Sequence, residues 1–159
     1  MSCGGLVVLG VITLPGVRES VANARLFLRD MLPVGLPALD DLVSVGSETV
    51  CNAIAHTASG HGGQVTVGLL VGEGLYRLEV ADDGAGGRRP YVKAEDGTES
   101  GRGMRVVEAL SERWGFRADG DRTVVWAEFR IGNSSGNSDR GLSPACPTLV
   151  PTACEEEKR

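Results

Sequence analysis

Aromatic residues and long hydrophobic runs are scarce in this sequence of 159 residues. Aromatic side chains make up 4% of the chain and hydrophobic ones 42%, so Leu, Val and Ala must fill most of the core. The apolar run from Leu6 to Leu14 is far shorter than the ~20 residues that span a bilayer, and no basic segment or small-residue cleavage site accompanies it. We therefore expect a buried first strand, no membrane association and a cytoplasmic protein.

A surplus of basic residues is also absent. The chain has 16 Lys and Arg against 21 Asp and Glu, for a net charge of −5. Because nucleic acids and anionic membranes attract positively charged surfaces, this balance argues against direct binding of either. The four cysteines lack the close spacing of zinc ligands, and nothing indicates an oxidising compartment, so we expect free thiols at Cys3, Cys51, Cys146 and Cys154.

Apolar periodicity divides the chain into an ordered region, residues 1–131, and a polar tail, residues 132–159. The tail offers too little apolar surface to offset the entropy of ordering, so we expect it to be disordered. In the ordered region the patterns predict strands at Leu6–Thr13, Gln64–Leu70, Leu75–Ala81, Phe116–Ala118 and Thr123–Ile131, and helices at Ser20–Met31, Leu39–Thr57 and Met104–Trp114. This order predicts an α+β fold: a two-layer sandwich with a mixed or antiparallel sheet and helices on one face.

A carboxylate and an amide share one face of the second predicted helix. Glu48 and Asn52 are four residues apart, so their side chains project to the same side, and His56 extends this face. An amide oxygen is a suitable Mg²⁺ ligand, and a carboxylate beside it can take up a proton. Taken alone, this pattern is more often a solvent-exposed polar stripe on an amphipathic helix.

An acidic residue and two glycines follow the third predicted strand. Asp82 can accept a hydrogen bond from an exocyclic amine such as that of adenine, and Gly84 and Gly86 let the backbone turn close to a flat ring. Asp83 is expected to face solvent. By itself, an Asp-Gly sequence of this kind is more often an ordinary connection between two elements.

A second glycine pair, Gly101 and Gly103, comes directly before the third predicted helix. Free N–H groups at a helix start, with glycines that allow close approach, suit phosphate binding. The long segment between Gly86 and Gly101 is typical of a lid. Neither a Walker A motif nor a Rossmann fingerprint is present. The hydroxyl of Thr123 could reach an adenine through water, but taken alone a β-branched residue here is more often an ordinary strand residue.

In this order and spacing, the three motifs resemble the N, G1 and G2 boxes of the GHKL ATPases, which share the Bergerat fold and include histidine-kinase catalytic domains. Within this family, the chain is most similar to the anti-sigma serine kinases of the RsbW type, in the stand-alone form found in actinomycetes. The resemblance covers about residues 12 to 130 and leaves the tail outside. It implies ATP and Mg²⁺ as cofactors.

The resemblance also implies how the adenine would be held. Asp82 would bind the adenine amino group. Gly84, Gly86 and Thr123 would support it. All of these residues are present in this sequence, which favours real nucleotide binding.

The phosphate end follows from the same resemblance. Asn52 would ligate the Mg²⁺ that bridges the phosphates, and Gly101 and Gly103 would form the end of the lid over them. Glu48 would be the general base, which draws a proton from a partner serine as that serine attacks the γ-phosphate. These parts are the ones that phosphoryl transfer requires.

Three functions are compatible with this resemblance. The first is an ATP-dependent protein serine/threonine kinase, an anti-sigma factor in transcription regulation that phosphorylates a STAS-type anti-anti-sigma partner. The alternative is a module that binds ATP and a sigma factor or another partner without significant kinase activity. A detached histidine-kinase-like ATPase domain is disfavoured, because no helix with a phospho-acceptor His precedes the first motif. Whether the chain forms a homodimer is left open.

Overall fold

Along the chain a strand, two helices, two strands, a helix and two strands follow one another in the order that the sequence predicts. This computed structural model describes residues 5–84, 99–132 and 156–158, with side chains described for 5–84 and 104–132. The elements are β1 (Val7–Pro15), α1 (Ser20–Met31), α2 (Leu39–His56), the short 3₁₀ helix η1 (Ala58–Gly60), β2 (Gln64–Gly72), β3 (Leu75–Asp82), α3 (Glu99–Leu110), β4 (Arg113–Asp119), β5 (Arg122–Arg130) and β6 (Glu156–Lys158).

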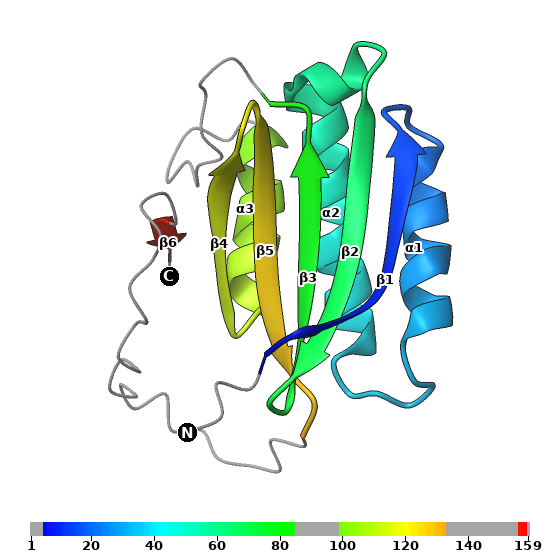
Figure 1. The fold of residues 1–159 in the computed structure, drawn as a ribbon, viewed down its shortest axis with the longest axis vertical. Coiled ribbons are helices and arrows are strands. Elements are labelled where there is room, and N and C mark those ends of the chain that lie inside the picture. Colours follow the sequence, from blue (N-terminus) through cyan, green and yellow to red (C-terminus); the bar gives the residue numbers. More distant parts are fainter. Residues whose placement is uncertain (1–4, 85–98, 133–155, 159) are drawn as a thin grey trace.

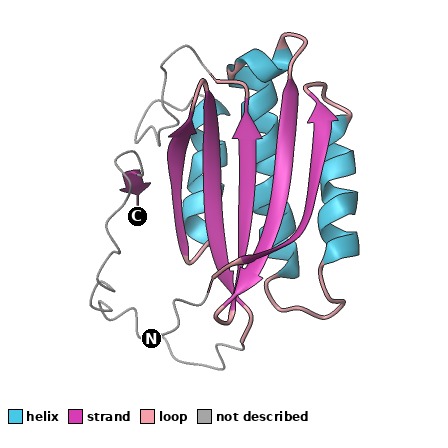
Figure 2. Ribbon diagram, in the orientation of Figure 1, coloured by secondary structure: helices cyan, strands magenta, loops and turns pink. Residues whose placement is uncertain are grey.

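The strands form one antiparallel sheet, and the helices cover one of its faces. The strand order is β1-β2-β3-β5-β4-β6, with every described neighbouring pair antiparallel. Figure 1 and Figure 2 show α1, α2 and α3 on the same side of the strands, so none of the described helices covers the other face of the sheet. The predicted α+β fold, with helices on one face, is confirmed.

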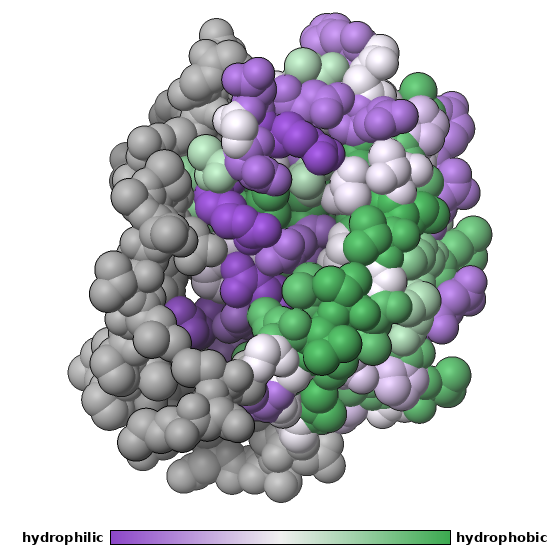
Figure 3. All heavy atoms as spheres, viewed as in Figure 1, coloured by the Kyte–Doolittle hydropathy of each residue, from purple (hydrophilic) through white to green (hydrophobic). Residues whose placement is uncertain are grey.

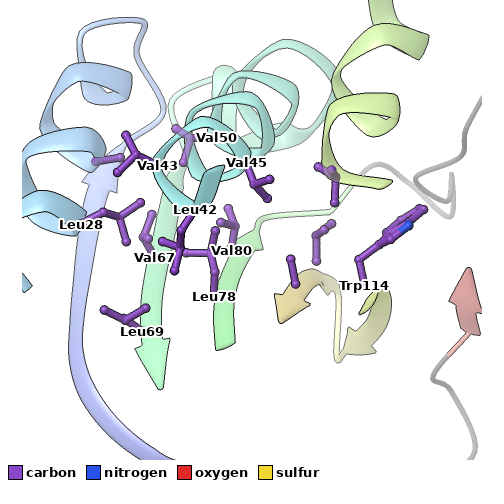
Figure 4. Packing of buried hydrophobic residues seen from close by; sticks show 14 of the residues in the cluster. Leu28, Leu42, Val43, Val45, Val50, Val67, Leu69, Leu78, Val80 and Trp114 are labelled. Carbon is purple, nitrogen blue, oxygen red and sulfur yellow. The ribbon is translucent and has the colours of Figure 1, made fainter. Parts of the chain in front are cut away.

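The core lies between the sheet and the three helices. Strand β3 shows how the alternation builds it: Tyr76, Leu78 and Val80 are buried against the helices, whereas Arg77 and Glu79 point to the other face. Figure 4 shows the side chains of α1 and α2 interlocking with those of β2 and β3. The labelled residues are Leu28, Leu42, Val43, Val45, Val50, Val67, Leu69, Leu78, Val80 and Trp114.

Gly46 explains how closely the two long helices approach. It lies in the middle of α2, where glycine costs about 1 kcal/mol relative to alanine. A Cβ at this position would lie 2.5 Å from Leu28 Cδ1 of α1. An added Cβ would displace the buried Leu28 side chain, so the glycine favours the observed packing of α1 against α2, the helix that carries Glu48 and Asn52.

Several features differ from the sequence prediction. The first strand was expected to be buried, but in β1 only Leu14 is buried, and Val7, Val8 and Val11 are more than half exposed. Trp114 was expected at the end of the third helix, but α3 ends at Leu110 and Trp114 lies in β4 with 1% of its surface exposed. The sheet offers this large side chain a buried site that the helix surface does not. Within the segment predicted to be a tail, Glu156–Lys158 pairs with β4 as β6. In the described part of the chain, no helix has the length and apolar character to cross a membrane.

Candidate functional site

Asp82 ends strand β3 at the edge of the core. Only 5% of its surface is exposed, and its Oδ1 accepts a hydrogen bond of 2.7 Å from the backbone N–H of Gly84. Gly84 has a φ of +87°, and a Cβ there would overlap the carbonyl oxygen of Asp121. Only glycine fits this turn, and the turn holds the Asp82 carboxylate in one place.

The surroundings of the Asp82 carboxylate disfavour its charged form. Burial, as the main cause, raises the pKa of Asp82 above its ordinary range, and the charge of Asp83 raises it further. Hydrogen bonds from the backbone of Gly84 and Thr123, and the charge of Arg122, act in the opposite direction. A buried, poorly hydrated acceptor of this kind favours a ligand that brings its own N–H donor.

Thr123 lies beside Asp82 as the sequence predicts. The two residues are paired across β3 and β5, and Thr123 is half-buried near the start of its strand. The structure thus brings together the acidic residue, the glycine turn and the threonine hydroxyl. Gly86, the last member of this motif, lies outside the described residues.

Asp83 is partly exposed, with 33% of its side chain accessible, and its carboxylate is also bound by the neighbouring loop. Its Oδ2 accepts a hydrogen bond of 2.7 Å from the backbone N–H of Gln64. Its own N–H donates to Ser59 Oγ at 2.9 Å, and that hydroxyl donates to the Gln64 carbonyl at 2.7 Å. The Asp83 carboxylate thus serves as the acceptor for a loop N–H, a contact that the sequence pattern around Asp83 did not show.

A further bond ties this turn to the end of α2. The N–H of Ala58, two residues after the last residue of α2, His56, donates to the carbonyl of Gly84 at 2.8 Å. At 1.5 Å per residue, Asn52 lies about 6 Å and Glu48 about 12 Å back along the helix from His56. The residues therefore run in the order Asp82, Asn52, Glu48 away from the turn.

Asn52 faces helix α3. Its Nδ2 donates to Met104 Sδ at 3.7 Å, which orients the amide and leaves its Oδ1 available as an acceptor or a metal ligand. Glu48 is half-buried one helical turn earlier. Over the residues whose side chains the structure describes, no hydrogen bond or ion pair holds its carboxylate.

The glycines of the third motif lie within a helix. They were expected to precede a helix that begins at Met104, but α3 begins at Glu99, so Gly101 and Gly103 fall within its first turns. An acidic residue at the start suits the helix dipole, and the first turn needs few internal hydrogen bonds. The free N–H groups of a helix start therefore belong to residues 99–102.

Arg25 and Cys51 are neighbours of Glu48 that the sequence reasoning missed. Arg25 reaches from α1 to α2, where its Nε donates to Ser47 Oγ at 2.7 Å. Burial and then the charge of Glu48 raise the pKa of the Cys51 thiol, while Arg25 and Arg18 lower it. Arg25 and Arg18 are thus close enough to Cys51, which follows Glu48 by three residues on α2, to influence its thiol. The packing of α1 against α2 brings Arg25 to this position, and spacing along the sequence does not predict such a contact.

The described residues suit a metal ion that binds together with a phosphate ligand. Among the described side chains, no group of three His, Cys, Asp or Glu residues could hold a metal ion. Mg²⁺ commonly binds to one or two protein ligands and completes its shell with phosphate oxygens and water. The amide oxygen of Asn52 is a donor of the required type.

Comparison with known proteins decides the family. The family of the histidine kinase-like ATPase domain matches residues 14–129. The chain belongs to this family. The predicted GHKL ATPase fold is thereby confirmed, and membership implies ATP binding. The matched residues lie inside the predicted ordered region, 1–131, and no curated protein matches the chain.

A solved structure shows the same fold. The chain is similar to the RsbU and RsbW domains of Rv1364c from Mycobacterium tuberculosis, with a TM-score of 0.55 and 21% sequence identity. The match covers 77% of this chain and 32% of that one, so this chain spans less than half of that protein's length. At this identity the likeness concerns the fold.

Proposed function

We propose that this chain binds ATP with Mg²⁺ and acts as an anti-sigma serine/threonine kinase on a STAS-type anti-anti-sigma partner. The observation that carries the nucleotide part is the buried Asp82 carboxylate, fixed by the Gly84 turn and paired with Thr123. The domain family and the likeness to a structure that contains an RsbW domain support the regulatory part.

The adenine end follows from the chemistry of Asp82. A buried carboxylate gains most from a donor that replaces the water it has lost, and an exocyclic amine is such a donor. The hydroxyl of Thr123 adds a second polar group at the same place. Gly84 allows the tight turn that follows Asp82. Gly86 would let the next part of the backbone lie close to the adenine ring.

The phosphate end follows from the position of Asn52. Its side-chain amide is on the α3 side of α2, and its Oδ1 would ligate the metal. Gly101 and Gly103 would let the backbone of α3 lie close to the phosphates. When bound, Mg²⁺ supplies positive charge that offsets the negative charge of the transferred phosphoryl group.

Glu48 is the proposed general base. Its carboxylate would take the hydroxyl proton of a partner serine as the serine oxygen forms a bond to the γ-phosphorus. The bond from that phosphorus to the β–γ bridging oxygen breaks, and ADP leaves. The carboxylate has no partner among the described side chains, which leaves it able to accept this proton.

A second candidate function is supported by the same observation. A carboxylate that no neighbour orients is also compatible with a module that binds ATP and a sigma factor and transfers no phosphate. The two functions share the nucleotide site and differ only in what Glu48 does. A change at Glu48 therefore separates them.

The test is phosphotransfer from labelled ATP to candidate STAS proteins. We expect the wild type to label a serine or threonine of its partner. Glu48→Gln should lower the rate about 100- to 10,000-fold, as expected for loss of a general base, with ATP affinity unchanged. Glu108→Gln, at an exposed position of α3, is the matched control and should transfer at the wild-type rate. Equal labelling by Glu48→Gln would remove Glu48 as the base, and absence of label from wild type would favour the binding module.

A further inference from the structure

The face of the sheet that no described helix covers is hydrophilic on the side of β4. Figure 3 shows hydrophilic residues gathered over β3, β5 and β4. In the strand order, the short strand β6 lies beyond β4, and Figure 1 shows it beside that edge. The register joins β6 to three of the seven residues of β4, so the contact that covers this edge is short.

Charged side chains on this face form a series of ion pairs that begins and ends on β4. Arg113 Nη1 lies 3.8 Å from Glu128 Oε2, and Glu128 Oε1 lies 3.4 Å from Arg77 Nη1. Arg77 Nε lies 3.1 Å from Glu79 Oε1, which is 3.0 Å from Arg117 Nη1. The series therefore joins three cations through two anions, and the arginine at each end belongs to β4.

Trp126 of β5 is buried within this polar face. The Arg77 guanidinium stacks on its ring, 4.2 Å from the centroid, and 4% of its surface is exposed. Among the described residues, no acceptor is found for the buried Nε1–H of Trp126. Because a buried donor without an acceptor is costly, an additional acceptor at this place would be stabilising.

The strand register continues from Trp126 to an acidic position of β6. Trp126 is paired with Gly115 across β5 and β4, and Gly115 is paired with Glu157 across β4 and β6. Positions directly opposite each other in an antiparallel pair share a face of the sheet. Since Gly115 has no side chain, a carboxylate at the position opposite it would enter between the two arginines of β4.

We propose that the edge of β4 is a docking site for an extended acidic segment, and that β6 is the chain's own occupant of this site. The docked segment adds its backbone to the sheet. A carboxylate opposite Gly115 supplies a third anion to the series of ion pairs. The sequence Glu155-Glu156-Glu157 offers this charge. An acidic strand of a partner protein would have to displace β6, so the C-terminal segment acts as a competitor of that partner.

A tethered segment can compete even though its pairing is short. Three register pairs make a weak contact, but attachment to the same chain raises the effective concentration of β6 at β4 to about the millimolar range. Asp82 belongs to β3 and Glu48 to α2. Docking at the edge of β4 therefore does not require the proposed ATP site.

The test is hydrogen exchange of β4 in the full chain. The N–H groups that β4 directs toward β6 should be protected in wild type, and Glu157→Lys should speed their exchange about tenfold or more, because it replaces an attraction to the two arginines by a repulsion. Glu156→Lys is the matched control. It changes the net charge equally, but its register partner is Phe116, which belongs to the core on the helix side. Equal exchange in wild type and Glu157→Lys, or equal effects of the two lysines, would overturn the proposal.

A labelled peptide tests the competition. A fluorescein-labelled peptide of residues 152–159 that carries Cys154→Ser should bind the Glu157→Lys chain about tenfold more tightly than wild type, in which β6 occupies the edge. The same peptide with Glu157→Lys should bind neither chain. Equal affinity of the first peptide for both chains would overturn the competition. Protection of β4 that increases with protein concentration would show that a second copy supplies the strand, and would overturn occupation within one chain. ATP binding should be the same in both variants.

Discussion

Two carboxylates of the candidate site are held in opposite ways. Asp82 is buried, and the Gly84 turn donates a backbone hydrogen bond to it. Glu48 is half-buried on the surface of a helix, and none of the described side chains holds it. The first is therefore positioned by the fold before any ligand arrives. The second is positioned only by its helix and requires a bound partner to orient it.

This difference separates binding from catalysis. The adenine end is prepared by backbone hydrogen bonds that also stabilise the fold. The proposed base has no such support, and the docked serine would complete its surroundings. Changes near Asp82 should accordingly alter both stability and affinity, whereas changes at Glu48 should alter transfer alone.

The largest expected loss of stability is for Gly84→Ala. The positive φ strains any side chain, and the added Cβ would overlap the Asp121 carbonyl, so we expect a loss of about 3 kcal/mol in the free energy of unfolding. Gly35→Ala is the matched control, since Gly35 has the same φ of +87° with nothing within 4 Å of a Cβ. Urea unfolding of both variants measures the difference, and equal losses would show that the Asp121 contact is unimportant.

A smaller effect is expected for Asp83→Ala. The variant leaves the N–H of Gln64 without its acceptor, so we expect a loss of about 1 kcal/mol and a modest decrease in ATP affinity through the loosened turn. Asp119→Ala, at an exposed position of β4, serves for comparison. Thermal unfolding of the two variants should rank them in this order, and a neutral Asp83→Ala would mean that the turn is held without this bond.

The smallest effect is a pH dependence. The folded-state pKa of Asp82 is raised by burial, so protonation of this group favours the folded state. Its contribution to stability is fully present below the unfolded pKa and is lost as the pH rises through the folded pKa. ATP affinity should change in the opposite sense, because binding the amine requires the ionised form. Calorimetric titrations at several pH values should show affinity falling with acidity at a higher pH than an ordinary aspartate gives.

Most of the fold could be predicted because its causes are local. The alternation of Tyr76, Leu78 and Val80 and the helical spacing of Ala24 and Leu28 specify which face of each element is buried. Trp114 was wrongly assigned to the helix because it continues the helical spacing of apolar residues. An apolar residue at this position suits the start of a strand equally well. Only the sheet provides the site that buries it.

The sequence indicated which residues belong to the candidate site better than it indicated how they are arranged in space. Asp82 and Thr123 were expected together, and the strand pairing places them side by side. The hydrogen bond between Asp83 and Gln64 and the contact of Arg25 with Ser47 depend on loops and helices that are far apart in sequence. Contacts of that kind have no repeating pattern for sequence reasoning to detect.

The most direct test of the account is an ATP titration of wild type and Asp82→Asn with Mg²⁺ present. Asparagine keeps the size and the oxygen that accepts from Gly84 but loses the charge, so the apo protein should be as stable as wild type or more so. We predict that its ATP affinity falls about 10- to 100-fold, the loss expected for one hydrogen bond to a charged group. An Asp82→Asn variant that binds ATP with wild-type affinity would contradict the assignment of this site.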